Sequence, residues 1–356
     1  MSDLTEQWCE RVRAAAAAGT ALQIRGGGTK DFYGRIPVGE LFDTLGHTGV
    51  VNYEPTELVV TVRAGTPLAE LEALLATNGQ MLAFEPPHFG AGATVGGCVA
   101  AGLAGPRRLA AGGVRDFVLG VKIIDGRGEA LSFGGQVMKN VAGYDVSRAI
   151  AGSLGTLGLI TEVSLKVLPR PVAEVTLRFE IEEQDALNRL NDWGGQPLPI
   201  SGSTWRDGVL HLRLSGAEAA VRAAKQRLGG EVLDDVAGAA FWQAIREQQD
   251  GFFAPEAGEV LWRLSLPSSA APVKLSGQQL IEWGGALRWL RSSLPADAIR
   301  ERAAALGGHA TAFRGFDRAG DVFHPLSAPL RAIHCRLKQA FDPAGIFNPG
   351  RFYNGI

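Results

Sequence analysis

The 356-residue sequence lacks the features that mark several common classes of protein. Its three cysteines, Cys9, Cys98 and Cys335, lie far apart and form no C-x-x-C pair, so neither an iron–sulfur cluster nor a structural zinc site is expected. A sparse, odd set of cysteines is typical of a reducing compartment. The formal net charge of −2 predicts no nucleic-acid partner, and no apolar run is long enough for a membrane span.

Two phosphate-binding motifs are absent as well. No Gly-Lys pair occurs, which excludes a Walker loop. Gly26–Gly28 follows a strand-like run, but the residues after it have no helical apolar period, which excludes a Rossmann fingerprint. The triple glycine is therefore expected to lie in a loop, either as an ordinary surface turn or as a backbone cradle for an anion. The beginning of the chain predicts a short helix that ends at Gly19, and no signal peptide.

Glycine is abundant, and its distribution is uneven. Seventeen of the 47 glycines fall between Gly90 and Gly158, interleaved with strand-like runs. Residues 66–79 predict a helix that starts at an N-cap, Thr66, and ends at Gly79, with an apolar face made of Leu68, Leu71 and Leu75. Residues 1–170 therefore predict short strands, few helices and many glycine turns.

The pattern changes after the Pro169-Arg170-Pro171 stretch. A strand, a helix, a hairpin that turns at Asp207-Gly208 and a second helix follow in order, over residues 173–181, 182–193, 200–215 and 217–230. This β-α-β-β-α order predicts a ferredoxin-like unit. Two further strand–helix alternations reach to about residue 315, and a helix and a Pro/Gly-rich coil end the chain.

Four blocks of sequence, taken together, carry a family resemblance. They are "RGGGT" (Arg25–Thr29), "PPHFGAGATVGGCVAAGLAGPRR" (Pro86–Arg108), "MKNVAGYDVSRAIAGSLGTLGLITEVSLKVLPRP" (Met138–Pro171) and "LKQAFDPAGIFNPGR" near the end. In order and spacing they resemble the FAD-binding domain of the vanillyl-alcohol-oxidase or PCMH type, over nearly the whole chain. Within that superfamily the chain is similar to the FAD-binding E subunit of bacterial glycolate oxidase.

The resemblance implies an α+β fold with three parts. Residues 1–170 would form a PCMH-type FAD-binding domain of two α+β subdomains, and residues 171–318 a cap domain that contains the ferredoxin-like unit. Residues 319–356 would form a C-terminal segment that returns to the FAD domain. The helix predicted over 330–341 is expected to pack on that domain through the face formed by Leu330, Ile333, Leu337 and Phe341.

The resemblance also implies which residues bind FAD. The glycine loop would hold the diphosphate through backbone N–H groups, and the later blocks would form the remaining walls. The implied cofactor-binding residues are Arg25, Gly26, Gly27, Gly28, Thr29, Pro87, Thr94, Gly96, Gly97, Gly152, Gly155, Thr156, Gly158, Ile160 and Asn348. For Gly152, Gly155 and Gly158, tight strand packing is an alternative role. We expect non-covalent FAD, because Gly28 stands where some covalent relatives place His, and Cys98 is offset from the usual attachment cysteine.

Catalytic groups are harder to identify. The 2-hydroxy-acid dehydrogenases of the superfamily usually carry an H-x-G-D-G-N-x-H stretch that helps to bind metal and substrate, and this sequence has none. His88 and His309 could each supply a base, although each also fits a structural or surface role, and His334, within a predicted helix, fits a core or capping role. Candidate cations for a substrate carboxylate are Arg107, Arg108 and Arg351. No catalytic residue is therefore assigned, and no metal site is predicted.

The resemblance implies an FAD-dependent oxidoreductase that acts on a CH–OH donor, as the FAD-binding subunit of a multisubunit glycolate oxidase. Such a subunit would support oxidation of glycolate to glyoxylate and pass electrons to a partner, because it has no cysteine cluster of its own. The implied partners are a larger FAD-containing subunit and an iron–sulfur subunit, either in the cytoplasm or at the inner face of the cell membrane. A stand-alone, D-lactate-like 2-hydroxy-acid dehydrogenase and a subunit that has lost FAD are the alternatives.

Overall fold

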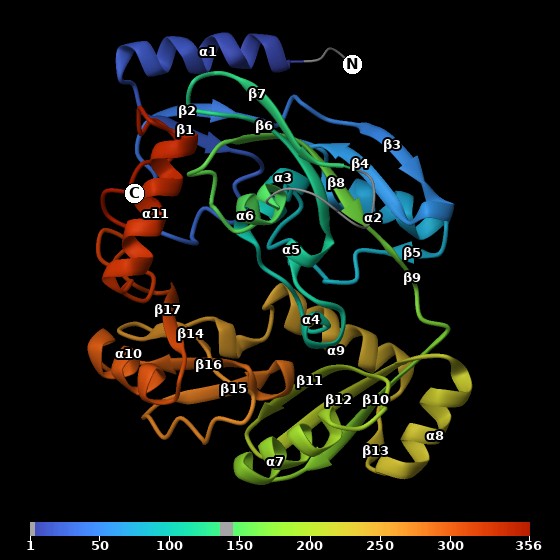
Figure 1. Ribbon diagram of the computed structural model, residues 1–356. Helices are drawn as coiled ribbons and strands as arrows, with labels where there is room; N and C mark the ends of the chain where they lie inside the picture. Colours follow the sequence, from blue (N-terminus) through green and yellow to red (C-terminus); the bar gives the residue numbers. More distant parts are fainter. Residues whose placement is uncertain (1–3, 136–144) are drawn as a thin grey trace.

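The computed structural model describes residues 4–135 and 145–356. They form two main β-sheets with helices against them, one from the first half of the chain and one from the second, as Figure 1 shows. The predicted α+β class is confirmed. The stretch from Met138 to Tyr144, which carries part of the family resemblance, lies outside the described residues.

The first main sheet has five strands in the order β3-β4-β8-β6-β7, and every neighbouring pair is antiparallel. Their bounds are β3 Val50–Glu54, β4 Val59–Arg63, β6 Val118–Ile124, β7 Ala130–Gly134 and β8 Leu159–Lys166. Helices α2 (Leu68–Thr77) and α3 (Val95–Ala101) bury apolar side chains in the core beside this sheet. Short elements complete this half: η1 Pro55–Glu57, β5 Gln80–Met81, α4 Arg108–Ala111, α5 Val114–Phe117, α6 Val146–Ile150 and β9 Leu168–Pro169.

The expected apolar face of α2 is confirmed, but its predicted N-cap is wrong by one residue. Leu68, Leu71 and Leu75 are all 0% exposed, as the helical spacing indicated. The N-cap position is Pro67, and the Thr66 hydroxyl instead accepts a hydrogen bond from the Gly49 amide at 2.9 Å. The buried Thr66 side chain is therefore used to join two loops, which local sequence does not encode.

A smaller parallel sheet positions the glycine loop. Strands β1 (Leu22–Arg25) and β2 (Glu40–Asp43) pair with each other, and the C-terminal tail adds a third segment beside β1. The Leu22 amide donates to the Ile346 carbonyl at 2.7 Å, and the Asn348 amide donates to the Leu22 carbonyl at 2.9 Å. Helix α1 (Thr5–Ala18) covers this sheet with a small apolar core and ends at Gly19, whose φ of 65° is left-handed, as predicted.

The second main sheet has eight strands in the order β13-β10-β12-β11-β15-β16-β14-β17. Its first four strands and two helices are β10 Ala173–Glu180, α7 Glu183–Gly194, β11 Ile200–Arg206, β12 Val209–Gly216, α8 Glu218–Leu228 and β13 Glu231–Val232. Numbered in chain order, these strands lie as 4-1-3-2, the ferredoxin-like arrangement that the sequence predicts.

The other four strands repeat the same spatial order. They are β14 Val260–Ser265, β15 Gln278–Glu282, β16 Leu287–Ser292 and β17 His309–Arg314, with α10 (Ala296–Ala305) before the last. Residues 266–277, all of which are described, contain no helix, so this half lacks the first helix of the unit. The two halves join through β11 and β15, and α9 (Asp235–Glu247), η2 (Gly251–Phe253) and η3 (Trp283–Gly285) fill the connections.

The C-terminal helix α11 (Ala328–Phe341) packs on the first half of the chain, but not by the whole face that the spacing predicts. Leu337 and Phe341 pack against the main core, whereas Leu330 and Ile333 are 50% and 49% exposed. The buried anchor is Lys338, whose ammonium donates to the Thr156 and Phe347 carbonyls at 2.8 Å each. The second half of α11 is therefore docked by two residues of the apolar stripe together with the buried Lys338. No helix in residues 4–135 or 145–356 is long and apolar enough to cross a membrane.

Candidate cofactor-binding site

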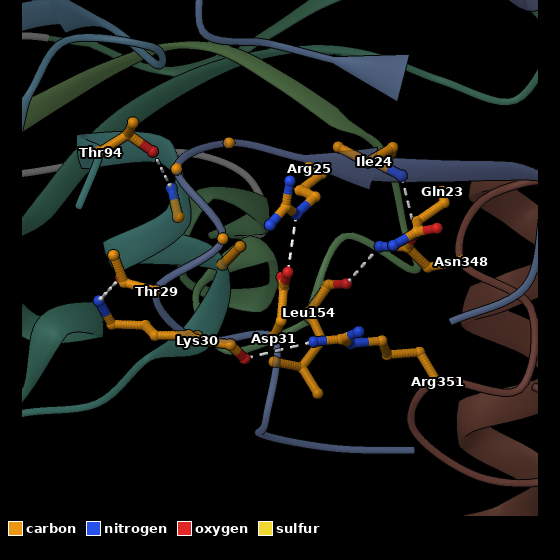
Figure 2. Close-up of a pocket in the computed structure, with 16 residues that line it drawn as sticks. Gln23, Ile24, Arg25, Thr29, Lys30, Asp31, Thr94, Leu154, Asn348 and Arg351 are labelled. Carbon is orange, nitrogen blue, oxygen red and sulfur yellow. Dashed lines mark hydrogen bonds and ion pairs between the residues drawn. The ribbon is translucent and has the colours of Figure 1, made fainter. Parts of the chain in front are cut away.

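A hollow lies where the C-terminal end of β1, the start of α3 and the C-terminal tail meet. Figure 2 shows its lining, which includes the loop from Arg25 to Asp31 and, from distant parts of the chain, Thr94, Leu154, Asn348 and Arg351. The loop begins directly after the last residue of β1, so the small parallel sheet fixes the position of the glycines at the edge of the hollow.

The glycines of this loop leave no room for side chains. A Cβ on Gly27 would lie 1.4 Å from the Gly92 carbonyl oxygen, and one on Gly26 would lie 2.6 Å from the Thr94 hydroxyl oxygen. Gly28 has a φ of +71°, a conformation that other residues rarely adopt. Backbone atoms therefore form this wall of the hollow, as a close approach to a ligand requires.

The backbone amides of the loop are available to a ligand. Among the described residues, 4–135 and 145–356, none accepts a hydrogen bond from the amides of Gly26 to Thr29. Consecutive amides without a protein acceptor suit the oxygens of a phosphate or diphosphate group.

Cations outnumber acids around the hollow. Arg25 pairs with Asp31 at 2.7 Å, while Arg351 donates to the Tyr33 carbonyl at 2.9 Å. Burial lowers the pKa of Arg351 to about 10, which leaves its guanidinium charged at neutral pH. Lys30 is the third cation, and burial lowers the pKa of its ammonium as well. The hollow thus has the charge that an anionic cofactor needs.

Asn348 ties the tail to the walls of the hollow. Its side-chain oxygen accepts from the Ile24 amide, and its side-chain nitrogen donates to the Leu154 carbonyl, both at 2.8 Å. A Cβ on Gly155, where φ is +72°, would lie 2.7 Å from that nitrogen. Residues more than 190 positions apart are thereby joined at one wall (Figure 2).

The structure brings together most of the residues that the family resemblance implies. An adjoining hollow is lined by Gly26, Gly96, Gly97, Gly155, Gly158, Ile160 and Asn348. Gly96 also permits close packing, because a Cβ there would lie 2.7 Å from the Ala64 Cβ. Gly158 is less tightly confined, with its nearest neighbour at 3.1 Å, so the strand-packing alternative applies to it in part.

Three of the implied residues lie elsewhere. Pro87 lines a different cavity, together with Arg263 and Glu282 from the second sheet. Gly152 and Thr156 line a hollow beneath α11, where the Thr156 hydroxyl donates to the Ser153 carbonyl at 2.8 Å. They belong to the same sequence block as Gly155, but they line a different hollow from the glycine loop.

The histidines do not gather at the glycine loop. His334 lies against Phe352, with 5.9 Å between ring centroids, and His309 lies 6.4 Å from His324. His88 has a partner that sequence reasoning missed: its Nε2 lies 3.0 Å from a carboxylate oxygen of Glu72 on α2. Glu72 lies four residues after Leu68, at the edge of the buried face of α2, and no local signal connects it with His88.

The candidate cations Arg107 and Arg108 are engaged away from the glycine loop. Arg107 pairs with Glu85 at 3.2 Å and with Glu174 at 2.9 Å. The Arg108 guanidinium lies over the Trp283 ring, 4.5 Å from its centroid. Only Arg351 of the three lines the hollow. Lys30 and Leu154 line it too, and sequence reasoning missed both, although Lys30 directly follows the glycine loop.

Comparison with known proteins agrees with this geometry. A family model described as an FAD binding domain matches residues 4–134. The chain is 53% identical over 351 residues to the glycolate oxidase subunit GlcE of Escherichia coli K12, covering 99% of this chain and 98% of that protein. It is 33% identical over 165 residues to the glycolate oxidase subunit GlcD of Bacillus subtilis 168, which is 46% of this chain and 35% of that one.

More distant similarities concern part of the chain or the fold alone. A D-lactate dehydrogenase of Archaeoglobus fulgidus is 31% identical over 212 residues, which is 53% of this chain and 47% of that enzyme. The solved structure of an alkyldihydroxyacetonephosphate synthase superposes with a TM-score of 0.68 at 16% identity, covering 97% of this chain and 74% of that one. This likeness shows that the two share a fold.

Proposed function

The chain belongs to the family of the glycolate oxidase subunit GlcE, and from this premise we propose that it is the FAD-binding E subunit of a multisubunit glycolate oxidase. The observation that carries the proposal is the 53% identity, which extends over 99% of the chain. The D-lactate dehydrogenase similarity covers only 47% of that enzyme, so a stand-alone dehydrogenase is not favoured.

FAD fits the hollow on the chain's own geometry. The backbone wall that admits no side chains, the amides without an acceptor among the described residues and the surrounding cations together suit a diphosphate. Bound FAD supplies two-electron redox chemistry. The loop amides would hold its diphosphate, while Asn348 and Gly155 would keep the adjoining wall in place.

We expect the cofactor to be non-covalent. Gly28 offers no side chain for attachment, and the Cys98 thiol is buried. Burial raises the pKa of Cys98 to about 12, so the nucleophilic thiolate is scarce at neutral pH. Acid precipitation of the purified protein should release all yellow colour into the supernatant, and colour in the pellet would refute non-covalent binding.

A partner is proposed to receive the electrons. The three cysteines are far apart in the sequence, and no group of three or more His, Cys, Asp or Glu in the described residues could hold a metal ion. The proposed partners are a larger FAD-containing subunit and an iron–sulfur subunit. The similarity to a GlcD subunit supports a complex of related flavoproteins, which would lie in the cytoplasm or at the inner face of the cell membrane.

We also propose that the chain divides functionally at residues 1–170, 171–318 and 319–356. Strand β8 of the first main sheet ends at Lys166, and β10 of the second begins at Ala173, so the main sheets separate near the first boundary. The tail returns to β1, which supports a separate role for the last part.

The proposal is tested by mixing the purified chain with glycolate under anaerobic conditions. We expect slow flavin reduction or none, because the histidine–carboxylate pair of His88 and Glu72 does not line the hollow. Dithionite should bleach the same sample, as a control. Adding the larger flavoprotein and iron–sulfur subunits should restore dye reduction, with iron found only in the complex. Rapid bleaching of the chain alone by glycolate would favour the stand-alone dehydrogenase.

A further inference from the structure

Lys30 has an unusual environment for a buried cation. Its ammonium lies 3.4 Å from the Thr29 hydroxyl oxygen and 3.2 Å from the His88 carbonyl oxygen, and 5.6 Å from the centroid of the Phe89 ring. In the described part of the chain, no carboxylate lies within ion-pair distance of it. The direct contacts of Lys30 are therefore with neutral groups only, the one with Thr29 is longer than a good hydrogen bond, and Glu247 acts on the ammonium from beyond ion-pair distance.

The nearest acids are already engaged. Asp31 pairs with Arg25 at 2.7 Å. Glu247 accepts from the His88 and Phe89 amides, at 3.0 Å and 2.9 Å, and pairs with Arg246 at 2.9 Å. Glu247 cannot turn to Lys30 without leaving the partly buried His88 and Phe89 amides without an acceptor, whereas the Arg25–Asp31 pair is about two-fifths exposed.

A second buried lysine shows what a structural role looks like in this protein. The Lys338 ammonium donates to two carbonyls and pairs with Asp342 at 2.7 Å, so its charge is compensated within the chain. Lys30 has no such carboxylate, yet it lines the same hollow as the free amides of Gly26 to Thr29. If Lys30 had only a structural role, burying its ammonium would cost desolvation free energy, and the few contacts it makes would offset little of that cost.

We propose that Lys30 is a binding residue for the diphosphate of FAD, supplying the positive charge that the glycine loop lacks. This inference rests on the proposed function. The loop amides provide directed hydrogen bonds but no net charge, and a diphosphate carries negative charge that needs compensation. A lysine ammonium is a compact point charge with three donors, which suits phosphate oxygens. Its contact with the Thr29 hydroxyl, at 3.4 Å, is long enough to be exchanged for one of them.

The test is a titration of the apoprotein with FAD and with ADP-ribose, which has the diphosphate but no flavin ring. The variants are Lys30→Gln, which removes the charge, and Lys30→Arg, which keeps it. Lys225→Gln, on the exposed face of α8, is the matched control. Loss of a charged hydrogen bond predicts that Lys30→Gln weakens both ligands by about 10- to 100-fold. Lys30→Arg should retain most of the affinity, and Lys225→Gln should match the wild type.

Salt gives a second readout. Wild-type affinity should fall as salt rises, and Lys30→Gln should fall less steeply, because one screened charge is gone. If Lys30→Gln weakens FAD but not ADP-ribose, the ammonium serves the flavin ring, and the proposal is overturned. Unchanged binding of both ligands overturns it too.

If Lys30→Gln fails to fold, Lys30→Arg provides the test. A salt dependence of FAD binding equal to that of the wild type supports the proposal, and weak, salt-independent FAD binding by Lys30→Arg contradicts it. Wild-type protein that binds no FAD would instead refute the proposed function.

Discussion

Glu85 and Arg213 form an ion pair between the two main halves of the molecule, with 2.8 Å between a carboxylate oxygen of Glu85 and Nη2 of Arg213. Glu85 precedes the Pro86-Pro87 loop, and Arg213 lies on β12. Arg107 also pairs with Glu85, and it continues the chain of charges to Glu174 on β10. Four charges of alternating sign thus hold the second sheet against the loop that leads to His88.

Glu85→Gln should destabilise the protein, because it leaves two buried guanidiniums with one carboxylate fewer. Breaking a buried pair from one side typically costs about 3–5 kcal/mol. Burial alone would raise the pKa of Glu85, but Arg213 and Arg107 outweigh it and hold the pKa below its usual range. In the wild type, the contribution of the Glu85 carboxylate to the free energy of unfolding is therefore present above about pH 4.5. It is lost as the pH falls further.

Chemical denaturation at pH 7 and below pH 4.5 measures both effects. Glu218→Gln, whose carboxylate is 77% exposed beside Arg222, is the control and should change little. Equal stability of Glu85→Gln and wild type at pH 7 would show that the network contributes nothing to docking of the two halves.

Gly27→Ala and Gly155→Ala should each abolish FAD binding. At Gly27 the added methyl group would overlap the Gly92 carbonyl, and at Gly155 it would meet Asn348 in a backbone conformation that alanine rarely adopts. The measurement is the flavin-to-protein absorbance ratio, with circular dichroism to follow folding. Gly194→Ala is the control, since no atom lies within 4 Å of its Cβ position. A folded Gly27→Ala variant with a full complement of flavin would contradict the cradle.

Asn348→Ala should lower both FAD affinity and thermal stability. The change leaves the Ile24 amide and the Leu154 carbonyl without their side-chain partner, at about 1–3 kcal/mol for each unsatisfied group. Deleting residues 342–356 should have the same effect in a stronger form. Asn354→Ala, at an exposed position of the same tail, should behave as wild type in melting and flavin titration. If Asn348→Ala and the deletion of residues 342–356 both retained a full complement of flavin, the tail would not contribute to FAD binding.

Glu282→Gln should flatten the pH dependence of stability. The Glu282 carboxyl is 5% exposed, accepts a hydrogen bond from the Trp289 indole at 2.7 Å, and faces Arg263 and Glu85. Burial raises its pKa from 4.5 to about 7. The folded protein therefore binds this proton more tightly than the unfolded chain does. The resulting stabilisation is fully present below pH 4.5 and is lost as the pH rises through about 7, and it amounts to roughly 3 kcal/mol.

Glutamine keeps the acceptor for Trp289 and removes the titration. The free energy of unfolding at pH 5 and pH 8.5 should therefore differ less in Glu282→Gln than in wild type. The exposed Glu301→Gln on α10 should show the wild-type difference. Parallel pH curves for Glu282→Gln and wild type would mean that this carboxyl does not titrate in that range.

Local pattern predicted much of the fold because the responsible interactions are local. Gly19 ends α1, Asp207-Gly208 turns the β11–β12 hairpin, and the leucines of α2 face the core, as their spacing indicates. The order of strands and helices was enough to predict the first ferredoxin-like unit. Its repetition in β14–β17 was not predicted, because the second copy lacks a helix and is recognisable only from the pairing of its strands.

The sequence by itself determined the family, the glycine-rich loop and the return of the tail, since these depend on short blocks with strong backbone requirements. Only the tertiary structure decided which charges meet: Glu72 with His88, Glu85 with Arg213, and Lys30 with no carboxylate in the described residues. It also separated Pro87, Gly152 and Thr156 from the glycine loop and left Leu330 exposed. The reason is physical: desolvation and ion pairing depend on which elements come together in space, and residues 128 positions apart, such as Glu85 and Arg213, carry no local sign of their contact.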